Sequence, residues 1–297
     1  MIIKNNTIST LWCIVTFCGA KVLLTACKKD GNPNNLPSVS PDDYIGKIDG
    51  YESSDEVFPE NLMAHWSFDE NANERLSNTA PTSAAGNSLV DGGVRGKAIR
   101  LDSGYIYYAN QIPKFNPATL RSFTISVWIK ILNNGSKRTM LMQMARPGMF
   151  NGNINFNVNT NSFPASNTAT FRFQPTFMTQ SGGLQDNLNL TFSPTIRADK
   201  WTHLVLTYYI SIGVFNNYAD GVLVGQFPNR GLVNTFFCHR PNEFIIGSNY
   251  NGIPGKEINT DANFVRMTGQ IDEIRVYNRP FTIAFVRALR ALGRANQ

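Results

Sequence analysis

The segment FTISVWI, residues 123–129, decides the fold class. Its side chains alternate with a period of two and are mostly β-branched or aromatic, which is the pattern of a β-strand. The segment NINFNVN, residues 153–159, alternates in the same way, with asparagine on one side and apolar residues on the other. Both segments predict strands in the middle of the chain.

More strands are predicted on both sides of these two segments. Residues 139–144 and 170–174 are candidate strands, and WTHLVLTY, residues 201–208, is a stronger and more buried one. Asp220-Gly221 lies between two short apolar runs, which is the signature of a hairpin turn. The segment IDEIRVY, residues 271–277, is the last expected strand.

Only one helix is expected, near the C-terminus, over residues 282–292. Thr282 is its expected N-cap and Gly293 its expected stop. Many short strands separated by turn signals, with almost no helix, predict a β-sandwich or barrel.

Composition and charge exclude some partners. The 297 residues are 42% hydrophobic and 16% charged, which is ordinary for a globular protein, and their number suits one large sandwich or two small domains. The net charge is +6, but Lys and Arg are scattered and form no dense run. A nucleic-acid partner is therefore not expected.

The N-terminus carries the features of an export signal. Residues 11–20 form an apolar run too short to span a membrane, and we expect residues 1–26 to be a signal peptide. The sequence Leu24-Thr25-Ala26-Cys27 resembles the lipobox of bacterial lipoproteins, so Cys27 is expected to receive the lipid. Lys21 departs from that pattern as a late charge. The alternative is an ordinary cleaved signal with an incidental cysteine.

Residues 27–57 are expected to form a lipid-anchored, flexible tether, because they are polar and have too few apolar residues to bury a core. Charges directly after the lipidated cysteine resemble surface-export tags. We therefore expect an outer-membrane lipoprotein exposed at the cell surface, which contacts the membrane only through its lipid anchor. Which leaflet displays the chain stays open. Residues 58–297 remain for the folded domain.

The cysteine count leaves no pair for an intramolecular disulfide. Cys13 and Cys18 leave with the signal and Cys27 takes the lipid, so Cys238 alone remains. Cys238 follows two phenylalanines, which predicts a buried, unreactive thiol.

Five segments together resemble the laminin-G-like, concanavalin-A-like family of jelly-roll domains. They occur in the family's order and are residues 62–69, 96–106, 123–129, 201–221 and 246–279. The resemblance implies an all-β fold, a two-sheet antiparallel jelly-roll sandwich with a short C-terminal helix. Residues 147–200 are long and rich in Asn, Gln and Ser, and this is where a binding surface of the chain's own would be built.

Catalytic motifs are not found. Related sandwich glycosidases place two carboxylates two residues apart on one strand, so that both lie on the same face. Here Asp272 and Glu273 are adjacent, and neighbouring strand residues point to opposite faces. The sequence also lacks a nucleophile elbow, a zinc-protease motif and a P-loop. These observations favour a protein that is not an enzyme.

Metal sites have little support from the sequence. Its three histidines, at 65, 203 and 239, are expected in or near the core. Family members often bind calcium, and the resemblance implies that Asp69, Asp102 and Asp272 could supply oxygen ligands. The alternative is that Asp69 and Asp102 form turns and that Asp272 caps a segment or pairs with Arg275; the lack of the family's usual loop after Asp69 favours it.

A sugar site needs aromatic faces and planar amides. Trp66, Trp128 and Trp201 occupy strand positions and are expected in the core, so stacking falls to other aromatics. The first choice is a loop residue, Tyr250. The other candidate ligand-binding residues are Asn249, Asn251, Tyr218 and Phe150.

The function predicted from these features is a non-catalytic, cell-surface module that binds carbohydrate like a lectin, or an adhesion module. It rests in part on fold analogy. One alternative is a protein-interaction or structural subunit of a surface complex. Another is a divergent glycoside hydrolase whose carboxylates come from loops. The sequence does not identify the glycan or the oligomeric state.

Overall fold

The computed structural model describes residues 45–297 except 111, 132–136, 160–171, 186–199 and 228–234. The expected signal peptide, Cys27 and residues 28–44 of the tether lie outside the described residues. Residues Gly46–Gln297 form one compact unit. In the described part of the chain, no helix is long and apolar enough to cross a membrane.

The unit is built from strands, three short 3-10 helices and one α-helix at the C-terminus. The first nine strands are β1 Leu62–Trp66, β2 Ser83–Asp91, β3 Lys97–Tyr108, β4 Phe123–Ile131, β5 Arg138–Ala145, β6 Ile154–Asn159, β7 Arg172–Phe173, β8 Thr176–Met178 and β9 Leu184–Gln185. The others are β10 Thr202–Tyr209, β11 Val214–Ala219, β12 Val222–Phe227, β13 Glu243–Ile246, β14 Phe264–Val265 and β15 Met267–Tyr277. The helices are η2 Ser54–Glu56, η3 Pro59–Asn61, η4 Tyr250–Gly252 and α2 Ile283–Arg294.

The strands form one continuous, curled sheet in the order β12-β11-β10-β4-β15-β3-β13-β5-β6-β8-β9. Strands β1, β2 and β7 attach to β15, β3 and β6. All pairings of named strands are antiparallel except the short one between β14 and β5. The expected jelly-roll class is confirmed, although its two layers belong to one hydrogen-bonded sheet rather than to two.

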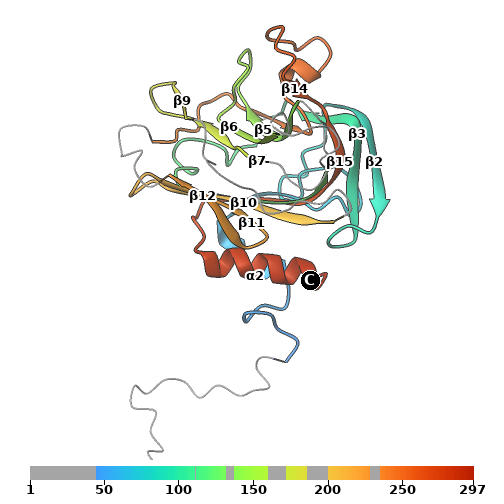
Figure 1. The fold of residues 1–297 in the computed structure, drawn as a ribbon, viewed down its shortest axis with the longest axis vertical. Coiled ribbons are helices and arrows are strands. Elements are labelled where there is room, and N and C mark those ends of the chain that lie inside the picture. Colours follow the sequence, from blue (N-terminus) through green and yellow to red (C-terminus); the bar gives the residue numbers. More distant parts are fainter. Residues whose placement is uncertain (1–44, 111, 132–136, 160–171, 186–199, 228–234) are drawn as a thin grey trace, which may run out of the picture. The chain divides into compact units, whose positions relative to one another are not determined.

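The curl brings two layers of the sheet face to face. Figure 1 shows β5, β6 and β14 in one layer, β10, β11 and β12 in the other, and β3 and β15 at the side where the sheet turns. The main apolar core contains residues from both layers. Trp66 stacks on Phe244 with ring centroids 4.2 Å apart, and Phe177 stacks on Phe215 at 3.9 Å.

The predicted elements are found close to their expected bounds. The segment 123–129 lies within β4, and Asp220-Gly221 makes the β11–β12 turn with φ of 48° and 74°. Cys238 is fully buried, and burial raises the pKa of its thiol to about 12. Trp66 and Trp128 are buried as expected, whereas Trp201 is only half-buried.

The helix α2 covers the outer face of the β10–β11 layer. Its side chains Val286, Leu289 and Leu292 pack on Val205 and Tyr218 of that layer. The helix begins after Thr282, as predicted, but it continues through Gly293 to Arg294. Gly293 is therefore not a stop. A β-carbon at Gly293 would lie 2.6 Å from the Trp128 ring, so glycine is needed there for close packing.

Replacing Gly293 with alanine should lower stability, although alanine is normally the better helix former by about 1 kcal/mol. The added methyl group overlaps the buried Trp128 ring, and such overpacking costs about 1–3 kcal/mol. Thermal unfolding of the purified chain measures the change. An unfolding midpoint at or above that of the unmodified chain would contradict this packing argument.

Residues just before β1 belong to the folded unit, not to a tether. Ile48, Tyr51 and Val57 join the apolar cluster under α2, and the ring of Phe58 lies 4.6 Å from that of Phe285. The boundary expected at residue 57 therefore falls inside the compact unit, which starts at Gly46. The composition of the segment hid this, because a few apolar residues suffice when they pack on a core built by the rest of the chain.

Candidate functional site

A groove of about 330 Å³ lies on the outer face of the β5–β6–β8 layer. We call it the amide groove, because four of its side chains are amides. Its lining residues are Arg138, Met140, Phe150, Asn151, Asn155, Asn157, Gln174, Thr176, Leu184, Asp261 and Phe264. The groove thus combines planar amides with two aromatic rings, the two kinds of side chain that a sugar site requires.

The alternation of β6 places the asparagines in the groove. Ile154, Phe156 and Val158 point into the core, so Asn155 and Asn157 lie on the groove side of β6, where they are 2% and 4% exposed and form its floor. Strand β5 departs from regular alternation, because its register with β6 shifts between Met140 and Met142.

Hydrogen bonds fix the floor of the amide groove. The Gln143 side-chain amide donates to Asn155 Oδ1 at 2.7 Å and to the Phe150 carbonyl oxygen at 2.9 Å. Asn155 Nδ2 donates to Thr176 Oγ1 at 2.9 Å, which ties β6 to β8. The backbone N–H of Gly152 donates to Asn155 Oδ1 at 2.9 Å. These bonds join three strands and the loop after β5, so the floor is held in place before any ligand arrives.

Two phenylalanines and a cation form one side of the groove. Phe150 and Phe264 are half-buried, and their ring centroids lie 5.6 Å apart with the rings steeply inclined. The Arg138 guanidinium carbon lies 5.7 Å from the centroid of Phe264. Aromatic rings that are partly exposed at the edge of an amide-lined depression can stack on the C–H face of a pyranose or furanose ring.

The first predicted ligand residue, Tyr250, is not available for stacking. Its side chain is only 1% exposed, and it packs in a small apolar cluster with Tyr107 and Ile253. Its hydroxyl donates to the Glu243 carboxylate. Asn249 is also buried, at 3% exposure. The loop position suggested exposure, but the loop folds back onto the sheet and buries its own aromatic residue.

The remaining predicted ligand residues lie in different places. Phe150 lines the amide groove. Tyr218 is buried under α2 on the opposite layer and cannot reach it. Asn251 does not line the groove, but it donates to Asn259 Oδ1 at 2.6 Å and accepts from the Ile258 N–H at 3.0 Å. Asn251 therefore shapes the loop that carries Asp261.

The three aspartates proposed for calcium do not form a cluster. No group of three or more metal-ligating acids, histidines or cysteines occurs among the described residues. Asp272 accepts from the N–H groups of Val94 at 2.7 Å and Glu273 at 2.8 Å, and Asp69 accepts from the Lys97 N–H at 3.2 Å. Asp102 is exposed on β3. Asp69 and Asp272 thus hold the loop before β3, and calcium binding by these aspartates stays a prediction.

The pair Asp272 and Glu273 is buried rather than split between two faces. The β15–β4 register shifts after Asp272, and Glu273 has φ of 48°, so regular alternation fails here. Burial and the nearby Glu273 carboxylate raise the pKa of Asp272 to about 8. Glu273 bonds to His65 at 3.1 Å and to Arg275 at 2.8 Å. Neither carboxylate is exposed by more than 4%, so the pair offers no accessible acid and base.

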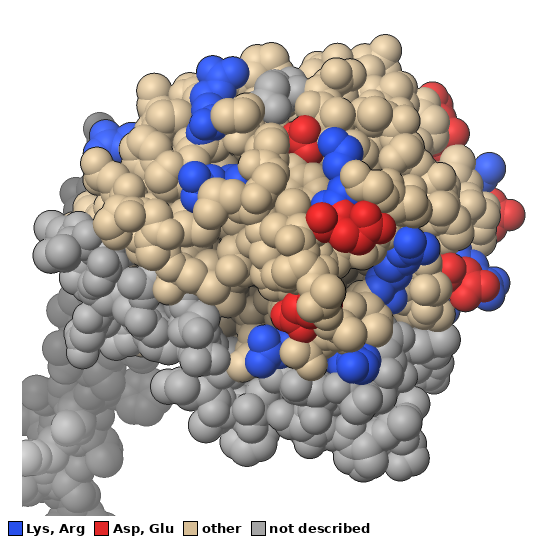
Figure 2. Space-filling view, turned by 90° about the horizontal axis from the view of Figure 1, so that it is seen from above, with Lys and Arg blue, Asp and Glu red and all other residues tan. Residues whose placement is uncertain are grey.

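The outer surface of the layer that carries the amide groove has few charged residues. Figure 2 looks onto it from above and shows mostly uncharged surface, with single basic and acidic residues scattered rather than gathered. Among the described residues that line the groove, Asp261 is the one carboxylate and Arg138 the one cation. This balance suits an uncharged, hydroxyl-rich ligand better than a polyanion.

Sequence inspection found only part of the groove. The alternation of residues 153–159 pointed to Asn155 and Asn157. It gave no sign of Arg138, Asp261 or Phe264, because these come from distant segments that only the fold brings together.

The solved structures that resemble this chain share its fold at low sequence identity. Domain 4 of AbnA, an extracellular GH43 arabinanase from Geobacillus stearothermophilus solved in complex with arabinotriose, is 20% identical with a TM-score of 0.52 and covers 77% of this chain and 98% of its own. The binding domain of Paraclostridial Mosquitocidal Protein 1 is 17% identical with a TM-score of 0.54. The binding domain of botulinum neurotoxin serotype D/C VPI 5993 is 15% identical with a TM-score of 0.53.

The chain spans about half the length of the two toxin binding domains. For the mosquitocidal protein the match covers 78% of this chain and 52% of that one, and for the neurotoxin 80% and 53%. No curated protein matches the chain in sequence.

The sequence profile of the concanavalin A-like lectin/glucanases superfamily, in its Laminin_G_3 form, matches residues 102–287. That range covers more than half of the chain and includes the strands from β4 to β15. With the curled antiparallel sheet described above, it establishes that this chain belongs to the concanavalin A-like lectin/glucanase superfamily.

Proposed function

We propose that this domain binds an uncharged glycan in the amide groove and does so without catalysis. The observation that carries the proposal is that the half-buried amides of Asn151 and Gln174 and the partly exposed rings of Phe150 and Phe264 line one groove. The amides can exchange hydrogen bonds with sugar hydroxyls while a ring covers an apolar sugar face. Domain 4 of the arabinanase, solved with arabinotriose, supports this class of ligand by analogy of fold alone.

The proposal includes display at the cell surface on a lipid attached to Cys27. Residues 48–58 pack against α2 on one layer, and Figure 1 shows α2 on the side of the sheet opposite to β5 and β6. Residues of β5 and β6 line the amide groove. Cells that express the chain with radiolabelled palmitate test the anchor. We expect the Cys27→Ala variant to lose the label, and unchanged labelling of the variant would contradict the anchor.

Arabinotriose and a panel of neutral oligosaccharides are the first probes for the groove. We expect calorimetry with the purified chain to detect binding, and we expect Phe264→Ala and Gln174→Ala each to weaken it at least about tenfold, as residues at the centre of an interface do. Phe285→Ala is the matched control, because Phe285 is also a half-buried phenylalanine but lies on α2. Equal affinity for the groove variants and the unmodified chain would place the ligand elsewhere.

A protein-binding role is the outcome to pursue if no glycan binds to correctly folded protein. A hydrolase role is less well supported, since the described residues of the groove supply one carboxylate where a glycosidase uses two.

A further inference from the structure

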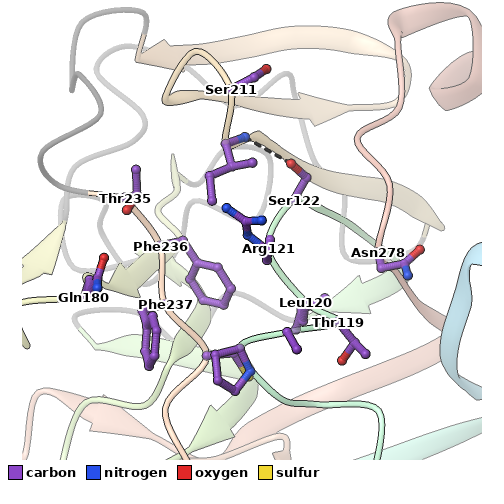
Figure 3. A pocket seen from close by; sticks show the side chains of 14 residues that line it. Thr119, Leu120, Arg121, Ser122, Gln180, Ser211, Thr235, Phe236, Phe237 and Asn278 are labelled. Atoms are coloured by element: carbon purple, nitrogen blue, oxygen red, sulfur yellow. Dashed lines mark hydrogen bonds between the residues drawn. The ribbon is translucent and has the colours of Figure 1, made fainter.

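A larger cavity of about 730 Å³ lies away from the amide groove, among loops at the ends of strands β4, β10 and β15 (Figure 3). We call it the end cavity. It is lined by residues 117–122, 210–211 and 235–238, together with Gln180 and Asn278. Its volume is within the range of about 300–1,000 Å³ found for small-molecule sites. None of these residues lines the amide groove.

One cation stands in the end cavity without an acidic partner. Figure 3 shows Arg121 beside Phe236, with Gln180 and Phe237 on one side and Asn278 on the other. No salt bridge joins Arg121 to another described residue, and the described lining contains no Asp or Glu. A guanidinium with all its donors available is the group that binds a carboxylate through two parallel hydrogen bonds.

Two neighbouring polar groups can add donors. Ser122 Oγ accepts from the Ile210 N–H at 3.0 Å, so its own O–H can point elsewhere. Asn278 Oδ1 accepts from Asn61 Nδ2 at 2.9 Å, which leaves the Asn278 NH₂ group to donate. The half-buried ring of Phe237 supplies an apolar surface. The end cavity therefore favours a ligand with a carboxylate, further oxygen acceptors and an apolar face.

We propose that the end cavity is a second binding site, which takes an acidic saccharide and binds the carboxylate of a uronate residue through Arg121. The ring hydroxyls accept from Ser122 and Asn278, and the sugar's C–H face lies on Phe237. This site is independent of the amide groove, so the domain has one site for neutral and one for acidic glycans.

Calorimetry of the purified full-length chain with trigalacturonate tests the second site, and galactotriose serves as its uncharged counterpart. We expect trigalacturonate to bind at least about tenfold more tightly than galactotriose, and Arg121→Met to remove that difference, because a charge-assisted bond is lost. Raising the salt concentration should weaken trigalacturonate binding to the unmodified chain but not the residual binding to the variant.

Phe264→Ala, in the amide groove, is the control and should bind trigalacturonate like the unmodified chain. Arg121 is exposed, so the unfolding midpoint of Arg121→Met should equal that of the unmodified chain. Loss of trigalacturonate binding in Phe264→Ala, or unchanged binding in Arg121→Met, would overturn the proposal, whether or not neutral glycans bind the amide groove. Failure of trigalacturonate to bind the unmodified chain at millimolar concentration would overturn it as well.

Discussion

Replacing Arg275 with methionine lowers the free energy of unfolding by about 3–5 kcal/mol, the cost of leaving a buried charge without its partner. Arg275 is 2% exposed, and its guanidinium donates to Glu273 Oε2 at 2.5 and 2.8 Å. It also donates to the Ser54 carbonyl at 2.8 Å and to Asp55 Oδ1 at 2.8 Å. One side chain of the last strand thereby fastens the segment before β1 to the sheet.

The expected loss comes mainly from the carboxylate that remains. Burial opposes the ionisation of Glu273, but Arg275 and the hydrogen bond with His65 lower its pKa to about 2, so it is charged at neutral pH. Without Arg275 that charge is buried and poorly compensated. Adding Glu273→Gln to Arg275→Met should therefore restore part of the stability rather than reduce it further.

Urea unfolding at pH 7 of the two variants and of Arg287→Met measures this effect. Arg287 is an exposed arginine of α2 and controls for the loss of a surface charge. If the free energies of unfolding of Arg275→Met and the unmodified chain differ by less than about 1 kcal/mol, as for loss of a typical surface pair, the contacts of Arg275 with Glu273, Ser54 and Asp55 do not stabilise the fold.

Local patterns predicted the strands and the C-terminal helix because their causes are local. The alternation of residues 123–129 and the Asp220-Gly221 turn each depend on a few neighbouring residues, and both are found. The failures have non-local causes. Tyr250 is buried because Glu243 and Tyr107 lie beneath its loop, and Gly293 is required by Trp128, which is far away in sequence.

The candidate site was only partly predictable for the same reason. Period-two alternation held in β6 and gave Asn155 and Asn157, but it failed where the strand register shifts, at Met140 and after Asp272. A register shift moves side chains from one face to the other without a clear signal in composition. The aromatic side of the amide groove also depends on residues far apart in sequence, since Phe150 meets Phe264 only after the sheet has closed.

The second large expected effect is a dependence of stability on pH that His203 controls. His203 is fully buried, stacks on Trp128 at 4.8 Å and contacts Ser126 Oγ through Nε2 at 2.7 Å. Burial, followed by the charges of Arg290 and Arg294, lowers its pKa to about 3. An unfolded histidine titrates near about 6.5. Between these values the unfolded chain binds one more proton, so His203 makes the free energy of unfolding decrease as pH falls from about 6.5 toward 3.

Asp272 acts in the opposite direction over part of that range. Its pKa of about 8 exceeds the ordinary value of 3.8, so the folded chain binds the extra proton and its stability increases as pH falls from 8 toward 4. His65, whose pKa burial also lowers, acts in the same direction as His203. Because these contributions oppose one another, the part due to His203 is separated from the others by substituting this residue alone.

His203→Gln removes the imidazole that takes up a proton in the unfolded chain, while the amide of the glutamine can still reach Ser126. Between pH 6.5 and 4.5, the free energy of unfolding should fall less steeply for this variant than for the unmodified chain, by about 1.4 kcal/mol per pH unit. Urea unfolding at a series of pH values measures both slopes. Ser126→Ala is the control: it keeps the histidine, so it should lower stability at every pH with the slope unchanged. Equal slopes for His203→Gln and the unmodified chain would mean that His203 is not the residue that couples this fold to protons.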